Sequence, residues 1–151
     1  AASDQSTSTT NQPQKPEIEK AQQHAENCWK TLTSLLVNSG GRLPSRKVID
    51  LLVDGGLVHY GARNSSLKIT NAGFQFLLQS KASQLWTLIF AYFQQNFETD
   101  EPRRKILSFL FSIARLPCGS VIDVSLFEDS VIGEFLATLH GIGVVVDARS
   151  K

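Results

Sequence analysis

The chain begins with a polar segment and then changes to helical spacing of apolar residues. Residues 1–16 contain Ser, Thr, Gln, Asn and Pro with almost no apolar side chains. Such a segment buries too little surface to offset its ordering entropy, so we expect a disordered linker, with order beginning near Glu17. Residues 18–37 place their apolar side chains on one stripe, which predicts a helix that ends at the polar residues 38–41. The stripe contains Ala21, Ala25, Cys28, Leu32, Leu35 and Leu36.

The next segment predicts a helix, a β-hairpin and a further helix. We expect the first helix to begin at Pro44 and to end at a glycine pair. Proline has no amide proton, and this costs nothing in the first helical turn, where the amides have no hydrogen-bond partner in the helix. Residues 57–60 and 67–69 are short β-prone segments around a polar turn, which predicts a hairpin. Thr70 then caps a helix over residues 71–78. This order is that of a winged-helix unit in which one helix before the hairpin is missing, so either the unit is abbreviated or the predicted boundary near Gly41 is misplaced.

Two strongly apolar helices follow, over residues 82–97 and 102–114. Both are apolar around nearly the whole circumference, which is typical of a buried helix. We therefore predict that these two helices form the centre of the fold, where truncation of Phe109 should cost on the order of 3–5 kcal/mol. We also expect Trp29 and Trp86 to be core residues, with exposed anchors for a partner as the alternative.

The C-terminal part predicts one more helix and a strand. Residues 131–140 have helical spacing, and Gly141 follows as a left-handed stop. Residues 142–146 are rich in β-branched side chains and predict a strand. A helix, a glycine pair and a β-branched segment thus occur twice in the chain, which favours a second unit whose wing is truncated.

The predicted fold is mostly α with short β-hairpins, in the α+β class, with tandem winged-helix-like units around buried central helices. The first unit spans residues 17–79 and the second residues 80–151. The sequence leaves open whether residues 76–114 belong to the first unit, the second unit or a shared core. The chain contains no methionine, even at its start, so we expect a fragment of a longer protein.

Composition narrows the classes of function. The chain has 151 residues, of which 42% are apolar, and a net charge of +1, so it carries no strong field for a polyanion such as a nucleic acid. Its longest apolar stretch, residues 85–93, is shorter than the ~18 residues that suggest a membrane span, so we expect no membrane contact. No signal peptide is visible. Two distant cysteines, Cys28 and Cys118, fit a reducing compartment and are expected to be buried.

The sequence contains no pattern that points to catalysis. It lacks a phosphate-binding glycine loop and the G-x-S-x-G, H-E-x-x-H and C-x-x-C motifs. Its histidines fall in three different predicted elements, so we expect surface or hydrogen-bonded imidazoles rather than metal ligands. Acid pairs at residues 100–101 and 128–129 fit helix starts, and Ser125 with Glu128 has the spacing of a capping box. We therefore expect no enzymatic activity, no cofactor or metal, and no small-molecule substrate. The histidines are His24, His59 and His140.

Basic residues of the first unit keep nucleic-acid binding open as an alternative, because winged helices use the helix before the wing to enter the major groove. Asp50 lies one turn after Arg46, so we expect a solvated face whose charges pair with each other, and the matching helix of the second unit has Glu134 but no Lys or Arg. Sequence-specific readout is therefore not expected, and a weak contact with the DNA backbone stays as the alternative. The candidates in the first unit for contact with a partner or the DNA backbone are Arg42, Arg46, Lys47, Arg63 and Lys68.

A second basic group, Arg103, Arg104 and Lys105, opens a predicted helix. Positive charge at a helix start opposes the helix dipole, which indicates either a partner that needs these side chains or neutralisation inside the chain. Asp100 and Glu101 lie directly before the run and are the residues that would neutralise it. The sequence does not decide between the two interpretations.

Several segments together are similar to a known family. Residues 69–78 read ITNAGFQFLL, which is a long and unusual run, and the other matching segments are looser. They resemble the middle region of the TFIIH core subunit that anchors the XPB-type DNA translocase and stimulates its ATPase. The resemblance covers roughly residues 28–147. The matching segments are residues 28–29, 55–58, 69–78, 84–86 and 106–111.

The resemblance implies a non-catalytic scaffold of TFIIH, the nuclear complex that opens DNA at RNA polymerase II promoters and around lesions in nucleotide excision repair. It implies other TFIIH core subunits as partners, in particular those with a von Willebrand-type domain or zinc-binding elements. In the family, a C-terminal part that is absent here engages the translocase and a very small partner subunit. The run of residues 69–78 identifies the fold and not a site, because we expect its apolar side chains to be core. These are Phe74, Phe76, Leu77 and Leu78.

Overall fold

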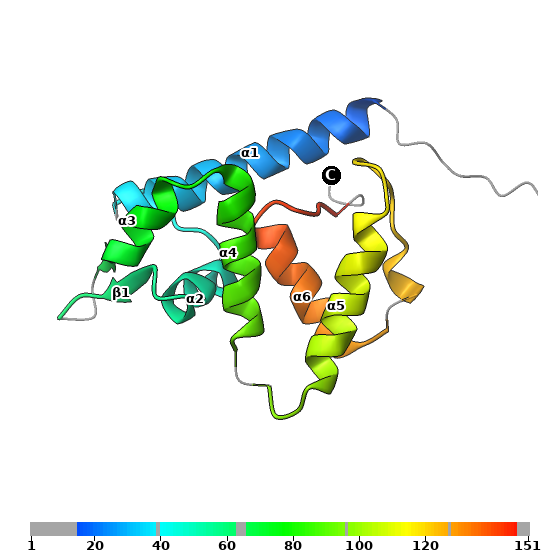
Figure 1. Ribbon diagram of the computed structural model, residues 1–151. Helices are drawn as coiled ribbons and strands as arrows, with labels where there is room; N and C mark the ends of the chain where they lie inside the picture. The colour runs from blue at the N-terminus through cyan, green and yellow to red at the C-terminus, as the bar shows by residue number, and fades with distance from the viewer. Residues whose placement is uncertain (1–14, 39, 63–65, 96, 127, 148–151) are drawn as a thin grey trace, which may run out of the picture.

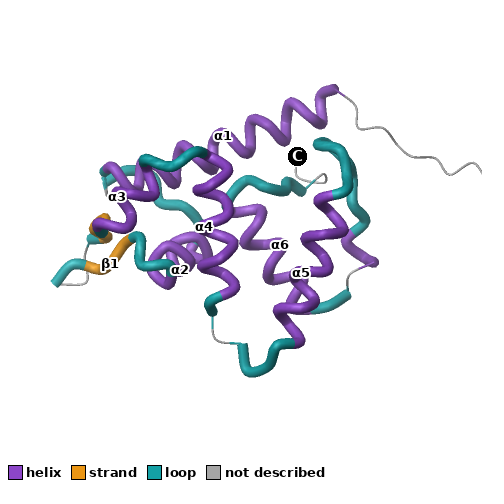
Figure 2. Tube along the Cα trace, in the orientation of Figure 1, coloured by secondary structure: helices purple, strands orange, loops and turns teal. Residues whose placement is uncertain are grey.

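The computed structural model describes residues 15–147, except residues 39, 63–65, 96 and 127. Within these residues the chain is mostly helical with one two-stranded antiparallel sheet, which confirms the predicted α+β class. Figures 1 and 2 show α1 lying across the other helices, with the hairpin at one end of the molecule and α5 towards the other. The elements are α1 (Lys15–Val37), α2 (Arg46–Asp54), β1 (Val58–Tyr60), β2 (Leu67–Ile69), α3 (Asn71–Leu77), α4 (Lys81–Phe93), α5 (Glu101–Ala114), η1 (Val124–Leu126) and α6 (Ser130–Gly141).

The helix α1 begins earlier than the sequence predicts. Lys15 and Pro16 are helical and are not part of the predicted linker, whose residues 1–14 lie outside the described residues. Proline is tolerated at this place because the first-turn amides of a helix have no partner within it. The C-terminal half of α1 supplies its contribution to the core. The buried residues are Trp29, Leu32, Leu35 and Leu36.

The helix α2 begins later than predicted. Pro44 lies outside the helix, and Ser45 is the residue that precedes the first turn. The Ser45 carbonyl accepts hydrogen bonds from the amides of Val48 and Ile49 at 3.0 and 3.1 Å, which fixes the start of the helix at Arg46. The helix then buries one face. The residues of that face are Val48, Ile49, Leu51 and Leu52.

The predicted hairpin and the helix that follows it are confirmed. The strands β1 and β2 pair antiparallel, with His59 opposite Lys68. The Thr70 hydroxyl oxygen accepts a hydrogen bond from the amide of Gly73 at 3.0 Å, so Thr70 caps α3 as predicted. The amide of Thr70 also donates to the carbonyl oxygen of Leu57 at 3.0 Å. The start of α3 is therefore tied to the beginning of the hairpin.

The centre of the fold is not the predicted pair of helices. The helix α2 packs against both α4 and α6, and α6 packs in turn against α5, which lies at the edge (Figure 1). The helix α4 ends at Phe93 and not at residue 97, and only one of its faces is buried. Phe109 of α5 is buried as predicted, whereas Leu107 and Phe111 are exposed. The prediction failed because α4 and α5 have a second apolar face that points away from the core.

The cap of α6 also differs from the predicted capping box. Asp129 precedes the helix, and its Oδ1 accepts a hydrogen bond from the amide of Val131 at 2.9 Å. Ser125, the expected cap, lies in the short turn η1, where its amide and hydroxyl donate to Asp123 Oδ1 at 2.9 and 2.7 Å. An acidic residue at the helix start is nevertheless confirmed for α6.

The predicted second wing does not form. Residues 142–146 have no strand partner among the described residues, because their amides close the end of α6. The amides of Gly143 and Val144 donate to carbonyls of the last turn of α6 at 3.1 and 2.9 Å. Gly143 has a φ of +80°, so it is the left-handed residue of this helix end, and Gly141 is still helical. The prediction of a strand over residues 142–146 is therefore wrong.

Candidate interaction surfaces

The described basic residues of the first unit lie in the loop before α2, at the start of α2 and on β2. Arg46 Nε and Asp50 Oδ1 are 3.0 Å apart, and both side chains are exposed. The Asp50 carboxylate raises the pKa of the Arg46 guanidinium, by its hydrogen bond first and by its charge second. Arg63 lies outside the described residues. The exposed basic residues of this group that have no acidic side chain within 4.0 Å, among the residues described, are Arg42, Lys47 and Lys68.

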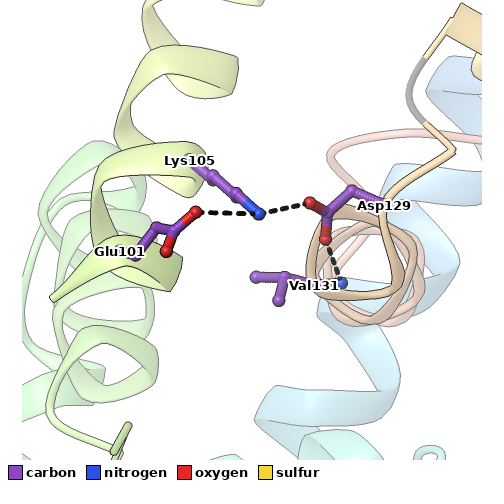
Figure 3. A network of polar contacts seen from close by, with 4 residues as sticks. All are labelled: Glu101, Lys105, Asp129 and Val131. Atoms are coloured by element: carbon purple, nitrogen blue, oxygen red, sulfur yellow. Dashed lines mark hydrogen bonds and ion pairs between the residues drawn. The ribbon is translucent and has the colours of Figure 1, made fainter. Parts of the chain in front are cut away.

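The basic run at the start of α5 is divided between internal contacts and solvent. Arg103 Nη1 and Asp100 Oδ1 are 3.0 Å apart. Lys105 Nζ lies 3.4 Å from Glu101 Oε1 and 2.8 Å from Asp129 Oδ2 (Figure 3). Two of the three side chains are therefore neutralised inside the chain, and contact of the run with a partner stays a prediction.

The contact between Lys105 and Asp129 joins α5 to the start of α6. The hydrogen bond from Lys105 lowers the pKa of Asp129, and the bond from the amide of Val131 lowers it further. Asp129 in turn raises the pKa of Lys105. The Asp129 carboxylate thus caps α6 and also binds Lys105 of the neighbouring helix α5.

Arg104 is the member of the run that stays unpaired. It is exposed, and no acidic side chain of the described residues lies within 4.0 Å of it. The two basic groups are not brought together, because α2 and the hairpin lie away from α5 (Figure 1). The described basic candidates therefore form two separate groups, one around α2 and β2 and one at the start of α5, and not a single basic patch.

Large apolar side chains are exposed on α3 and α4, where burial is the main expectation and exposure of Trp86 the alternative. Trp86 and Phe90, one turn apart on α4, are 55% and 64% exposed, and their ring centroids are 6.4 Å apart. Phe74 and Leu78, at the same spacing on and after α3, are exposed as well. The expectations of core positions for Trp86, Phe74 and Leu78 are therefore wrong, whereas Trp29 and Phe76 are buried as predicted.

The sequence around α4 lacks charged residues. Between Lys81 and Glu98 there is no charge, so α4 has no charged side to turn towards water. Gln84 is the polar residue that is buried, and its Nε2 donates to the carbonyl of Phe76 at 3.0 Å. Large exposed apolar side chains of this kind are typical of interaction sites on proteins.

Two of the three histidines meet, contrary to their separation in the sequence. The imidazoles of His24 on α1 and His140 on α6 have centroids 4.4 Å apart, and His24 Nε2 donates to the His140 carbonyl at 2.9 Å. Burial first and the charge of His24 second lower the pKa of His140. Cys28 Sγ lies 3.5 Å from His24 Nε2 and is half-buried, whereas Cys118 is exposed and not buried as expected. The described residues contain no group of three or more side chains arranged to hold a metal.

A hollow of about 590 Å³ lies between α2 and α4. Asp50 and Asp54 supply its carboxylates, and Asp50 is paired with Arg46. No histidine, cysteine or serine lines it, so it lacks a nucleophile with an adjacent base. The residues that line the hollow are Asp50, Val53, Asp54, Ala91, Gln94 and Gln95.

No helix in the described part of the chain is long and apolar enough to cross a membrane.

Comparison with known proteins decides the family. The model of the family described as transcription factor Tfb2 matches residues 1–151. The chain belongs to the Tfb2 family. This Tfb2-family chain is 31% identical over 129 residues to the general transcription and DNA repair factor IIH subunit TFB2 of Yarrowia lipolytica, a match that covers 85% of the chain and 27% of the relative.

Two further relatives agree with this assignment. The protein of the same name from Saccharomyces cerevisiae is 31% identical over 109 residues, with 72% of the chain and 21% of the relative covered. The general transcription factor IIH subunit 4 of Dictyostelium discoideum is 27% identical over 134 residues, with 86% and 27% covered. The resemblance to a TFIIH subunit is confirmed, and the Tfb2-family chain spans about a quarter of the length of these relatives.

Proposed function

We propose that this Tfb2-family chain is a non-catalytic protein-interaction module of the nuclear factor IIH assembly, with a scaffolding role in transcription and DNA repair. The names of its relatives, which describe subunits of general transcription and DNA repair factor IIH, support the assembly. The absence of a nucleophile with a base in the described hollow supports a role without catalysis. Other subunits of the factor are the proposed partners.

The exposed face of α3 and α4 is the observation that carries this proposal. It is formed by large apolar side chains, and aromatic residues in particular supply most of the energy of protein interfaces. The α4 part of the face contains Trp86 and Phe90 without a charge between Lys81 and Glu98. Contact with another core subunit would remove these rings from water. Contact with the XPB-type translocase, and with it regulation of its ATPase, is proposed to lie mainly in parts of the subunit beyond this chain.

The test is a binding assay of the 151-residue chain against each separately purified core subunit of factor IIH. One subunit should bind, and Trp86→Glu should weaken that binding about thirtyfold, because loss of a central interface tryptophan costs on the order of 2 kcal/mol. Val121→Glu, which also changes an exposed apolar residue but lies in the loop after α5, is the matched control and should bind normally. The proposal fails if no subunit binds the wild-type chain, or if Trp86→Glu binds as tightly as wild type.

A second candidate function is contact with the DNA backbone through the first unit. We infer that α2 and the hairpin form an abbreviated winged helix, since the hairpin follows the helix directly. The unpaired basic residues Arg42, Lys47 and Lys68 favour this candidate. A duplex titration at two salt concentrations tests it: affinity should fall steeply with salt and should drop in the Arg42→Glu, Lys47→Glu double variant. Affinity that is unchanged in this variant would reject the candidate.

A further inference from the structure

The outer face of α5 combines exposed apolar side chains with unpaired arginines. Arg104, Leu107, Phe111 and Arg115 are spaced by three, four and four residues, so they form one stripe along the helix. Leu107 and Phe111 are 42% and 68% exposed, although the loop after α5 runs along one flank of the helix (Figure 1). We call these four residues the α5 stripe. Its centre is apolar and both of its ends are cationic.

The charges of the α5 stripe are not used within the described chain. Arg103 and Lys105, the sequence neighbours of Arg104, are held by acidic side chains of α5 and of the residues that precede α5 and α6. By contrast, no acidic side chain of the described residues lies within 4.0 Å of Arg104 or Arg115. The sequence placed three basic residues in a row, and the structure separates the two that stabilise the fold from the one that is available for binding.

We propose that the α5 stripe binds an acidic amphipathic helix of a partner protein. The two guanidinium groups are eleven residues apart, about 16 Å along a helix axis, and they suit carboxylates at a similar separation. Leu107 and Phe111 between them require apolar side chains on the partner. A DNA backbone would offer phosphates but no apolar group to cover Phe111, so the stripe favours a protein partner. This inference names a partner chemistry and a second surface for the interaction module proposed above, and rests on that role.

The test uses the 151-residue chain and a fluorescent synthetic peptide of about 18 residues. The peptide carries leucines at three- and four-residue spacing with glutamates on both flanks, and two comparison peptides have the glutamates replaced by glutamine or the order scrambled. Anisotropy should give a dissociation constant of roughly 10–100 μM at low salt for the acidic amphipathic peptide only. The Arg104→Glu, Arg115→Glu double variant and Phe111→Ser should each weaken binding about tenfold or more. Lys30→Glu, which reverses the charge of an exposed basic residue on α1, should bind as wild type.

Several outcomes would overturn the inference. They are equal binding of the scrambled peptide, equal binding by the double variant, and no binding at about 1 mM peptide. Tighter binding of a DNA duplex of about 20 base pairs that depends on the same arginines would assign the stripe to phosphate instead. No factor IIH subunit is needed in this assay, so its result is separate from that of the subunit-binding test. Trp86→Glu should bind the peptide normally, because Trp86 lies on α4 and not on the stripe.

Discussion

Gly73 is the position where a single added methyl group should have the largest effect on the hairpin and α3. A Cβ at this position would overlap the carbonyl oxygen of Leu57 and would stand 2.8 Å from Ile69 Cγ1. The same place is fixed by hydrogen bonds, because the Thr70 amide donates to Leu57 and the Gly73 amide donates to the Thr70 hydroxyl oxygen, both at 3.0 Å. Gly73→Ala therefore forces α3 away from the hairpin.

The expected loss of stability in Gly73→Ala follows from two destabilising contributions and one stabilising contribution. Overpacking of a rigid contact costs about 1–3 kcal/mol. Movement of α3 away from Leu57 breaks the hydrogen bonds that the amide and the hydroxyl of Thr70 donate to the carbonyls of Leu57 and Gly56, and each of these contributes about 1 kcal/mol. Alanine is favoured over glycine inside a helix by about 1 kcal/mol, which offsets part of this loss. The free energy of unfolding should therefore fall by about 2–4 kcal/mol in Gly73→Ala.

Urea unfolding followed by tryptophan fluorescence measures this change. Gly133→Ala is the matched control, because Gly133 is also helical, is exposed, and has no atom within 4 Å of the added Cβ. The control should gain up to about 1 kcal/mol from helix propensity alone. If Gly73→Ala is as stable as wild type while Gly133→Ala is stabilised, the close approach of α3 to the hairpin does not constrain the fold and the reasoning is refuted.

Three further predictions concern the remainder of the fold. Partial burial and the charge of His24 hold the pKa of His140 below its ordinary 6.5, so folding favours the neutral ring. Stability should fall as pH drops from about 7.5 through 6.5 to 5.5, and His140→Gln should flatten this slope in urea unfolding at each pH. Phe135→Ala should lose about 3–5 kcal/mol in the same assay, because this ring is 1% exposed and packs on aromatic rings of α4 and α5. Asp129→Asn should lower the melting temperature less at about 1 M salt than at low salt, because it removes the charge that Lys105 contacts.

Local signals allowed most of the secondary structure to be predicted. Thr70 caps the next helix with its own hydroxyl oxygen, which needs no contact with distant residues. The hairpin is likewise predicted from neighbouring residues, since two short β-prone segments flank a polar turn. The starts of α1 and α2 were placed two or three residues away, since proline fits near a helix start at more than one position.

Other predictions failed because they depend on contacts that the local spacing of residue types does not show. Residues 142–146 have β-branched side chains, but the amides of Gly143 and Val144 bond to the end of α6, and no strand of the described residues lies opposite. Lys105 could not be separated from Arg104 by sequence, because its nearer carboxylate belongs to Asp129, which is 24 residues away. Periodicity contains no information about such pairings.

The largest error, the predicted burial of α4 and α5, follows from the same property that supports the proposed function. A helix that is apolar on all sides can be buried on all sides only if neighbouring elements surround it. Here α2, α4 and α6 share one core, and α5 lies at its edge, so each of α4 and α5 has one face left over. Trp86 and Phe111 belong to those faces, and exposed aromatic residues are favoured where a second protein covers them. An excess of apolar surface over what the fold can bury is therefore the feature that supports the proposed interaction, and it becomes visible only once the packing is known.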